Sequence, residues 1–286
     1  MVSVQACMSF LEPWPLPADK ESPYVRGVVE DGYPSTNFKN EDHNVLFTDA
    51  RSFKDRFTLD QHGFAWTSSS ALPGHVLEII RSKDKDRVTS DYYPLVETLL
   101  RDTLGASRVI MFDHTYRKRD PSLNMKDNPN QREQPATVAH CDQSALGASR
   151  RVERHAGDDA ERLLQGRCQL INVWRPISGV VEDWPLAVMD FQTIKPSEVH
   201  PTNIFRQRED FIGQTVGINH SPEQKWYYLE KQTPEEVTLI KIWDNKNDVA
   251  KMCAHSAFQH SDHERATIPR ESIEVRCLVF YEETQA

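Results

Sequence analysis

The 286-residue sequence predicts an α+β fold with a mainly β core, arranged as a jelly roll or barrel that is buttressed by helices. Two observations support this prediction. Helical patterns lie mainly before Gly166, and short strand-like runs separated by Pro, Gly, Asn and Asp follow them. The chain also has no GxGxxG or GxxxxGK(S/T) motif, which weakens an alternating βαβ nucleotide-binding fold. We therefore expect a single domain over residues 1–286.

The first part of the chain combines an irregular arm, a helix and a long loop. Residues 1–45 are rich in Pro, Asp, Glu and Asn, which predicts a covering arm with one or two short strands. A helix is indicated from Ser90, its N-cap, to Gly105, its C-terminal stop, with apolar residues at helical spacing between them. Residues 108–112 form a β-rich run. Residues 117–135 contain three prolines and predict a long loop at the active site.

A second helical stretch is indicated from Ser144 to Leu164, with a break at Gly157. The chain then changes character and becomes rich in short β-prone segments. These strand-like runs lie at residues 169–174, 186–189, 215–218, 226–229, 237–243 and 275–281.

Composition excludes several classes of function. The 34 basic and 43 acidic residues give a net charge of −9, which argues against nucleic acid or an anionic membrane surface as a partner. No apolar run approaches the ~18 residues that span a bilayer, and the N-terminus lacks the pattern of a secretory signal. Five cysteines without CxxC spacing argue against a disulfide framework or a zinc ribbon. Together these features predict a cytoplasmic protein.

The 11 histidines include candidates for a metal site. His140 and Asp142 lie two residues apart in an extended segment, so both point to the same side and offer half of a 2-His-1-carboxylate triad. The other His-x-Asp run begins at His260, but only one histidine follows it. His255, in an apolar segment, is the best second histidine, and His260 is the alternative. A lone His-x-Asp run is, however, more often a surface pair or a hydrogen-bonded core histidine.

Two arginines that follow His255 in the sequence suggest that the site also binds an anionic molecule. Arg276 lies within an apolar strand, where a guanidinium needs an anionic partner, and a dicarboxylate would provide one. Arg270 and Ser272 are predicted to clamp one carboxylate end. For Arg276 two roles stay open: it holds the other end, or it neutralises Glu274 or a metal-bound carboxylate.

An ordered set of segments resembles one fungal and bacterial family, which contains the cephamycin methoxylase component, the aspergillic-acid hydroxylase/desaturase and a gibberellin desaturase. The resemblance extends over roughly residues 25–283. Its segments are residues 45–51, 59–64, 112–115, 138–142, 171–176, 185–187, 253–258 and 270–276.

The resemblance implies an iron(II)- and 2-oxoglutarate-dependent oxygenase on a double-stranded β-helix, which uses O2 to hydroxylate or desaturate a small natural product. It makes His140, Asp142 and His255 the iron ligands. It also makes Arg270 and Arg276 contacts of 2-oxoglutarate. One relative works with a partner subunit, so the resemblance leaves open a homodimer or a partner subunit.

The resemblance also includes an Asn-x-Trp-Arg-Pro segment that begins at Asn172. It implies that Asn172 and Arg175 belong to the cosubstrate site, with Arg175 holding the substrate, the cosubstrate or the neighbouring Asp183.

Two other functions fit parts of the pattern. The same His/Asp/His set suits a cupin-like zinc or nickel hydrolase or isomerase, because ligand type does not select a single metal. That function would give Arg270 and Arg276 no role in the site. The other alternative is a non-catalytic accessory subunit of an oxygenase, in which the histidines are structural.

Overall fold

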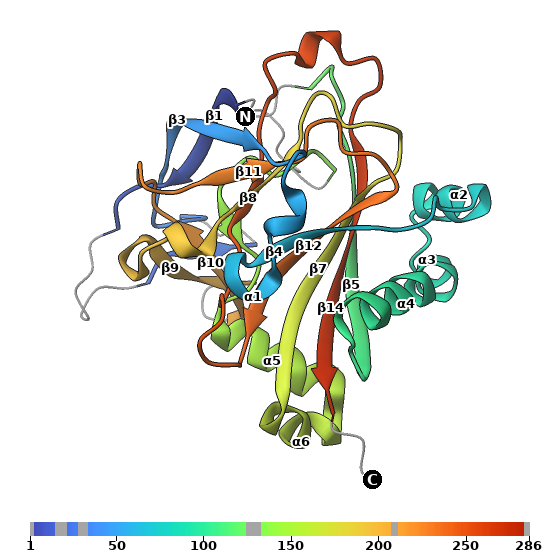
Figure 1. Cartoon of the computed structure of the whole chain (residues 1–286). Coiled ribbons are helices and arrows are strands. Elements are labelled where there is room, and N and C mark those ends of the chain that lie inside the picture. Colours follow the sequence, from blue (N-terminus) through green and yellow to red (C-terminus); the bar gives the residue numbers. More distant parts are fainter. Residues whose placement is uncertain (1–2, 15–21, 28–33, 124–132, 207–210, 283–286) are drawn as a thin grey trace.

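The computed structural model describes residues 3–14, 22–27, 34–123, 133–206 and 211–282, and two β-sheets form its centre (Figure 1). In sheet order, the larger sheet contains β1 (Ser3–Leu11), β3 (Asn40–Asp49), β11 (Trp226–Tyr228), β8 (Leu186–Met189), β13 (His255–Ala257), β6 (His140–Cys141), β10 (Phe211–Ile218), β9 (Val199–Phe205) and β2 (Tyr24–Arg26). The smaller sheet contains β4 (Phe64–Ser68), β12 (Glu236–Asp244), β7 (Arg167–Pro176), β14 (Glu271–Tyr281) and β5 (Arg108–Lys118). The mixed α+β, mostly sheet architecture agrees with the sequence prediction.

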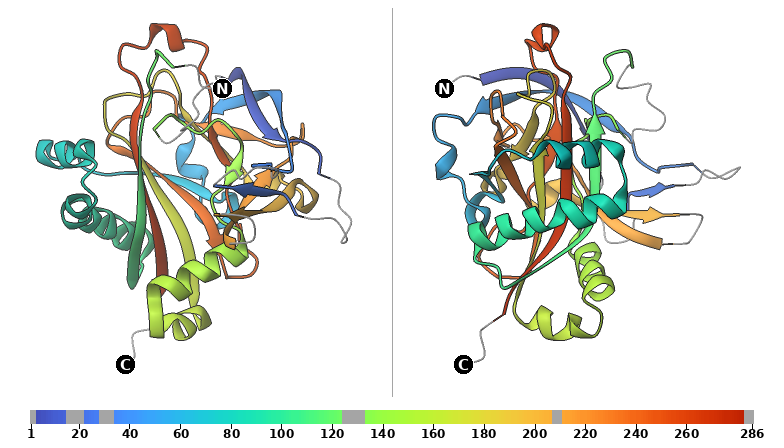
Figure 2. Two further views of the ribbon diagram at one scale, coloured as in Figure 1. Left: turned by 180° about the vertical axis from the view of Figure 1, so that it is seen from behind. Right: turned by 90° about the vertical axis from the view of Figure 1, so that its right-hand side faces the viewer.

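Helices cover the outer face and one end of the smaller sheet (Figure 2). The α-helices are α1 (Leu59–His62), α2 (Gly74–Ser82), α3 (Lys85–Asp91), α4 (Tyr93–Leu104), α5 (Ala145–Ala156) and α6 (Ala160–Gln165). Short 3-10 turns are η1 (Lys54–Arg56), η3 (Gly157–Asp159), η4 (Phe191–Thr193), η5 (Pro196–Glu198) and η6 (His263–Arg265). Helices α2 to α4 pack their apolar residues against the smaller sheet.

Apolar side chains on the two faces of the smaller sheet form two separate apolar layers. In β14, Ile273 and Val275 face the layer shared with α2 to α4, whereas Leu278 and Phe280 belong to the core between the sheets. Successive strand residues point to opposite faces, so a single strand can serve both layers. The inner layer leaves space for the polar side chains described below.

The helix predicted from Ser90 is wrong at its start. Ser90 lies inside α3, whose N-cap is Asp84, and the Asp84 side chain accepts a hydrogen bond from the backbone N–H of Arg87 at 3.1 Å. A separate helix, α4, begins at Tyr93 and contains a proline in its first turn, where proline is tolerated. Its predicted end is confirmed: Gly105 adopts the left-handed conformation with φ 67°.

The N-terminal arm is more regular than predicted. β1 has nine residues and pairs with β3 along its whole length, so the expectation of one or two short strands is wrong. The signal was present in the sequence, because Val4, Met8 and Phe10 alternate with polar residues and are buried. Residues 15–21 and 28–33 of the arm lie outside the described residues.

The predicted loop at residues 117–135 begins later than expected, because β5 continues to Lys118. Residues 124–132 of that loop lie outside the described residues. The second helical stretch is confirmed: Ser144 caps α5, and the chain breaks at Gly157 before α6. In the part of the chain that the structure describes, we find no helix with the length and apolar character that crossing a membrane requires.

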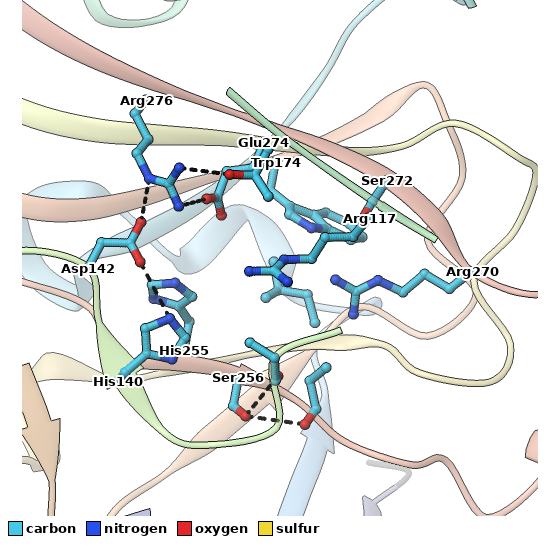
Figure 3. A pocket seen from close by; sticks show the side chains of 14 residues that line it. Arg117, His140, Asp142, Trp174, His255, Ser256, Arg270, Ser272, Glu274 and Arg276 are labelled. Carbon is cyan, nitrogen blue, oxygen red and sulfur yellow. Dashed lines mark hydrogen bonds and ion pairs between the residues drawn. The ribbon is translucent and has the colours of Figure 1, made fainter. Parts of the chain in front are cut away.

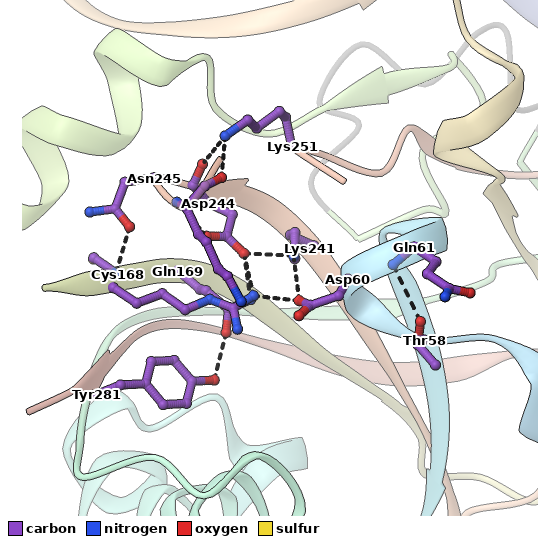
Figure 4. Close-up of polar contacts among 12 residues, drawn as sticks. Thr58, Asp60, Gln61, Cys168, Gln169, Lys241, Asp244, Asn245, Lys251 and Tyr281 are labelled. Carbon is purple, nitrogen blue, oxygen red and sulfur yellow. Dashed lines mark hydrogen bonds and ion pairs between the residues drawn. The ribbon is translucent and has the colours of Figure 1, made fainter. Parts of the chain in front are cut away.

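A buried charged cluster joins β12, β7 and α1 (Figure 4). We call Asp60, Arg167, Lys241 and Asp244 the Lys241 cluster. The Lys241 side chain is 0% exposed, and its Nζ lies 2.6 Å from Asp244 Oδ2 and 3.2 Å from Asp60 Oδ1. Arg167 pairs with both carboxylates and lies 2.7 Å from that of Asp244. Each charge in this cluster therefore has an opposite charge beside it.

Candidate metal centre

Three side chains able to ligate a metal ion meet where two strands of the larger sheet pair (Figure 3). His140 of β6 and His255 of β13 are direct register partners, and Asp142 follows β6 in the chain. One ligand atom from each residue lies within 4.8 Å of the other two. The structure thus brings together the three residues that the sequence predicted as a metal site, here called the triad.

Backbone carbonyls orient both imidazoles of the triad. Nδ1 of His140 lies 2.8 Å from the carbonyl oxygen of Val138, and Nδ1 of His255 lies 3.2 Å from that of Cys253. Because a carbonyl only accepts hydrogen bonds, each Nδ1 donates, and each Nε2 is the nitrogen left to bind a metal. Burial and the neighbouring His140 lower the pKa of His255 to about 4, which keeps this imidazole neutral.

Two adjacent strands hold the Asp142 carboxylate through one of its oxygens. Asn172 of β7 and Arg276 of β14 are register partners, and both donate to Asp142 Oδ2, at 2.7 Å and 2.9 Å. The other oxygen, Oδ1, lies 3.4 Å from Nε2 of His140. Although burial opposes ionisation, the charge of Arg276 and the neighbouring imidazole of His140 hold the pKa of Asp142 well below its ordinary value. The carboxylate is therefore ionised, with Oδ1 turned toward the histidines.

The guanidinium of Arg276 is occupied by protein groups on all of its edges. Besides Asp142, it contacts Glu274 at 2.9 Å, Asp113 at 3.1 Å and the hydroxyl of Thr115 at 2.8 Å. Of the two roles that the sequence left open for Arg276, these contacts match neutralisation of Glu274 and of the triad carboxylate.

Arg270 differs from Arg276 because, within the described residues, its buried guanidinium has no ion-pair partner. Nη1 donates to the carbonyl of Trp184 at 2.7 Å, and Cζ lies 4.9 Å from the ring centre of Trp174. Nε has no hydrogen-bond partner in the described part of the chain. Burial and the nearby Arg117 lower the pKa of Arg270 to about 9. Since a buried unpaired charge is costly, this end of the pocket favours an anion.

One pocket contains both features, with the triad at one end and Arg270 at the other (Figure 3). Ser272 and Trp174 of the smaller sheet line it between them. Two imidazole nitrogens and a carboxylate are the donor set that non-haem iron(II) prefers. A guanidinium without a partner fits a carboxylate group. The residues present therefore suit both iron(II) and 2-oxoglutarate.

Known proteins resemble this chain over nearly its whole length. The family described as "Oxidoreductase/YMDC permease-like domain" matches residues 8–280. The Fe(II)/2-oxoglutarate-dependent dioxygenase nvfI of Aspergillus novofumigatus is 37% identical over 261 residues, which is 91% of each chain. The chain belongs to this oxygenase family.

A second relative and a solved structure agree with this membership. The hydroxylase/desaturase efuI of Hormonema carpetanum is 32% identical over 269 residues, 88% of each chain. A structure of the iron and alpha-ketoglutarate-dependent endoperoxidase NvfI matches with a TM-score of 0.90 and 35% identity over 99% of both chains. The chain is thus an oxygenase that requires iron(II), 2-oxoglutarate and O2, and the zinc or nickel hydrolase alternative is not supported.

Two residues that were predicted for the site of this oxygenase lie elsewhere. Arg175 points to the face of β7 opposite Asn172, where it donates to the backbone carbonyls of Pro234, at 2.6 Å, and Ser70. The physical reason is that successive side chains of a strand point to opposite faces. Arg175 lies three residues after Asn172, so its side chain points away from the pocket. His260, the alternative ligand, instead lies 3.2 Å from a carboxylate oxygen of Glu230.

Residues of β5 that line the pocket were missed by sequence reasoning. Thr115 and Arg117 both line it, and Arg117 is the register partner of Ser272. Placing residues 117–135 in a loop concealed Arg117. The available signal was the two-residue spacing of Asp113, Thr115 and Arg117 after the β-rich run, which predicts three polar side chains on one face.

Proposed function

We propose that this oxygenase holds iron(II) with His140, Asp142 and His255 and hydroxylates or desaturates a small natural product. The observation that supports this most directly is the pairing, in one pocket, of three convergent metal-ligand atoms with the unpaired buried Arg270. A metal triad alone would suit other chemistries. A triad with a buried cationic partner for a carboxylate suits a metal that works with an anionic cosubstrate.

The same proposal includes a single-domain double-stranded β-helix over residues 1–286. The triad comes from the larger sheet, whereas Asn172, Arg270 and Arg276 come from the smaller sheet or its edge. Both sheets contribute to one apolar core and to one pocket. Two sheets that enclose a site between their inner faces are what a jelly roll requires.

Bound iron(II) would activate O2 as the oxidant, and 2-oxoglutarate would supply two electrons as it loses CO2 and becomes succinate. The residues of the chain position these groups. Asn172 and Arg276 hold the Asp142 carboxylate by Oδ2 and leave Oδ1 for the metal. Arg270, assisted by Ser272, binds the carboxylate of 2-oxoglutarate far from the metal. Burial of Arg270 places that ion pair in a less polar surrounding than water and so strengthens it.

The oxidised substrate is a small molecule, as the names of the relatives suggest. The relative efuI is named a hydroxylase/desaturase, and the solved NvfI is named an endoperoxidase. We place this chain with the hydroxylases and desaturases, whose products either gain one oxygen atom or lose two hydrogens. Coupled measurement of succinate release and product mass, with candidate metabolites as substrates, distinguishes these outcomes.

The site itself is tested by absorption spectroscopy without O2. Iron(II) and 2-oxoglutarate together should give a weak visible charge-transfer band in the wild type. His140→Ala and His255→Ala should remove the band, whereas His260→Ala, the matched control outside the pocket, should retain it. A wild type without the band, or histidine variants that keep it, would contradict the proposed iron site. A band without succinate formation on any substrate would instead favour an accessory subunit.

A further inference from the structure

An aromatic and basic cluster lies where α5 contacts β5 and has no part in the function proposed above. Phe112 is in β5, and Arg151 and His155 are on α5. The Phe112 and His155 rings stack with centroids 5.0 Å apart and planes 25° apart, and Cζ of Arg151 lies 5.4 Å from the Phe112 ring centre. We call these three residues the Arg151 cluster.

A β-bulge places this cluster close to the metal centre. Arg276 of β14 pairs with Asp113, and the next residue, Cys277, pairs with Met111, so Phe112 is the extra residue of β5. A bulge redirects side chains, and bulges are common beside active sites. Asp113 therefore reaches Arg276 at 3.1 Å, while Phe112 packs against the core between the sheets. Two ion pairs, through Asp113 and Arg276, connect this bulge to Asp142.

Polar groups of two residues in the cluster lack hydrogen-bond partners within the described part of the chain. Within the described residues, Arg151 is half-buried and has no hydrogen bond or ion pair, and the buried Nε2 of His155 has no hydrogen-bond partner. Burial and the charge of Arg154 lower the pKa of Arg151. The charge of Arg276 lowers it further, whereas the carboxylates of Asp113 and Asp142 raise it. An added anion would relieve the excess of positive charge at this place.

A neighbouring arginine shows that this arrangement is not general on α5. Arg150 is exposed and lies 4.4 Å from the ring centre of Phe211, on a strand of the other sheet. Arg150 and Arg151 thus share a helix and an aromatic contact. The charge of Arg151 interacts with those of Asp142 and Arg276. Arg150 is therefore a matched control.

We propose that Arg151 binds a carboxylate group of the substrate, and that Phe112 packs against the apolar skeleton next to that carboxylate. A guanidinium offers two parallel hydrogen bonds to a carboxylate, and the adjacent aromatic face provides apolar contact area. The inference rests on the proposed function, because it assigns the substrate of that site. It narrows the substrate class to carboxylic acids with an apolar or unsaturated skeleton. Arg151 is then a specificity-determining residue.

Calorimetry with two matched probes tests this assignment. The enzyme is loaded with iron(II), saturated with 2-oxoglutarate and kept free of O2, and it is titrated with 2-naphthoate or with the neutral 2-naphthalenemethanol. The wild type should bind the acid at least about tenfold more tightly than the alcohol, since a hydrogen bond to a charged group has that magnitude. Arg151→Leu should abolish the preference, Arg151→Lys should keep part of it, and Arg150→Leu should keep all of it.

The preference for acid over alcohol, rather than overall binding, is the deciding readout, because a merely structural role of Arg151 would weaken both probes equally. Equal or undetectable binding of the acid to the wild type would overturn the proposal. So would equal losses in Arg150→Leu and Arg151→Leu, or displacement of the acid by additional 2-oxoglutarate, which would place it at Arg270. If the preference holds but no succinate forms with any substrate, the proposed function fails while the carboxylate site stands.

Discussion

Two buried groups of charged residues in the smaller sheet and beside it are built in opposite ways. In the Lys241 cluster each charge faces an opposite charge, and Gln169 adds a hydrogen bond to Asp244 at 2.9 Å (Figure 4). At the metal centre the charges do not balance within the described residues, since Arg270 has no ion-pair partner (Figure 3). The first arrangement is complete as folded, and the second is completed by ligands.

This difference separates a structural role from a binding role. A buried charge with a partner stabilises the folded chain only as long as the partner stays, because removal leaves an uncompensated charge. A buried charge without a partner destabilises the free protein and binds an anion more tightly. Loss of one residue should therefore have opposite consequences for stability in the two places.

The largest expected effect is on the Lys241 cluster. Asp244→Ala leaves Lys241 and Arg167 with the single carboxylate of Asp60, and it should lower the free energy of unfolding by about 3–5 kcal/mol. Urea unfolding of the metal-free protein measures this change. A loss below about 1 kcal/mol would mean that the buried ion pairs contribute no more than surface pairs.

The pH dependence of stability provides an independent check on the same residue. Burial alone would raise the pKa of Asp244, but hydrogen bonds from Arg167 and Lys241 lower it below its ordinary value. A lowered folded pKa means that this stabilisation is complete above the unfolded pKa of about 3.9 and is lost as the pH falls through the folded value. Asp244→Asn should therefore reduce the slope of stability against pH in the acid range.

Arg270→Met should have the opposite effect on stability and the next largest effect on binding. Removing the unpaired guanidinium should leave the free energy of unfolding unchanged or raise it by up to about 2 kcal/mol. The affinity for 2-oxoglutarate, measured by calorimetry with iron(II) and no O2, should fall about 100-fold, or about 2.7 kcal/mol. Destabilisation as large as that of Asp244→Ala would show that Arg270 is structural.

Local sequence patterns predicted the elements and residues that depend on few neighbours. The Ser144 cap, the break at Gly157 and the same-side placement of His140 and Asp142 each follow from a short segment. His255 could be chosen because its segment was apolar and lay downstream, although its pairing with His140 is a long-range contact. These parts of the fold and site were accessible without knowledge of the sheet order.

The sequence offered Glu274 or a metal-bound carboxylate as a partner of Arg276, but the other residues around Arg276 were not accessible, because they depend on which strands flank β14. Only the register with β5 and β7 places Asp113 and Asn172 beside it. Arg175 was a different kind of error, since the two-residue period counted from Asn172 already assigned it to the opposite face. Strand register, rather than residue type, thus determined which predicted arginines belong to the site.

A smaller effect is expected for Asn172, which orients the carboxylate without bearing a charge. Asn172→Ala removes the 2.7 Å hydrogen bond to Asp142 and should weaken iron(II) or manganese(II) binding about tenfold, with Arg276 still in place. The matched control is Asn245→Ala beside the Lys241 cluster, where the amide accepts from the backbone N–H of Cys168 at 2.8 Å. That variant should lose stability without losing metal affinity. Equal metal affinities in wild type and Asn172→Ala would refute the positioning role.

The smallest effect should come from an ion pair that water surrounds. Glu97 and Arg101 lie one turn apart on α4 at 2.8 Å, and both side chains are more than one third exposed. Glu97→Gln should lower the free energy of unfolding by only about 0.3–0.5 kcal/mol, and high salt should reduce even this difference. Urea unfolding at low and high ionic strength measures both quantities. A salt-independent loss near that of Asp244→Ala would show that burial does not distinguish these pairs, because the N–O distances in the two places are similar.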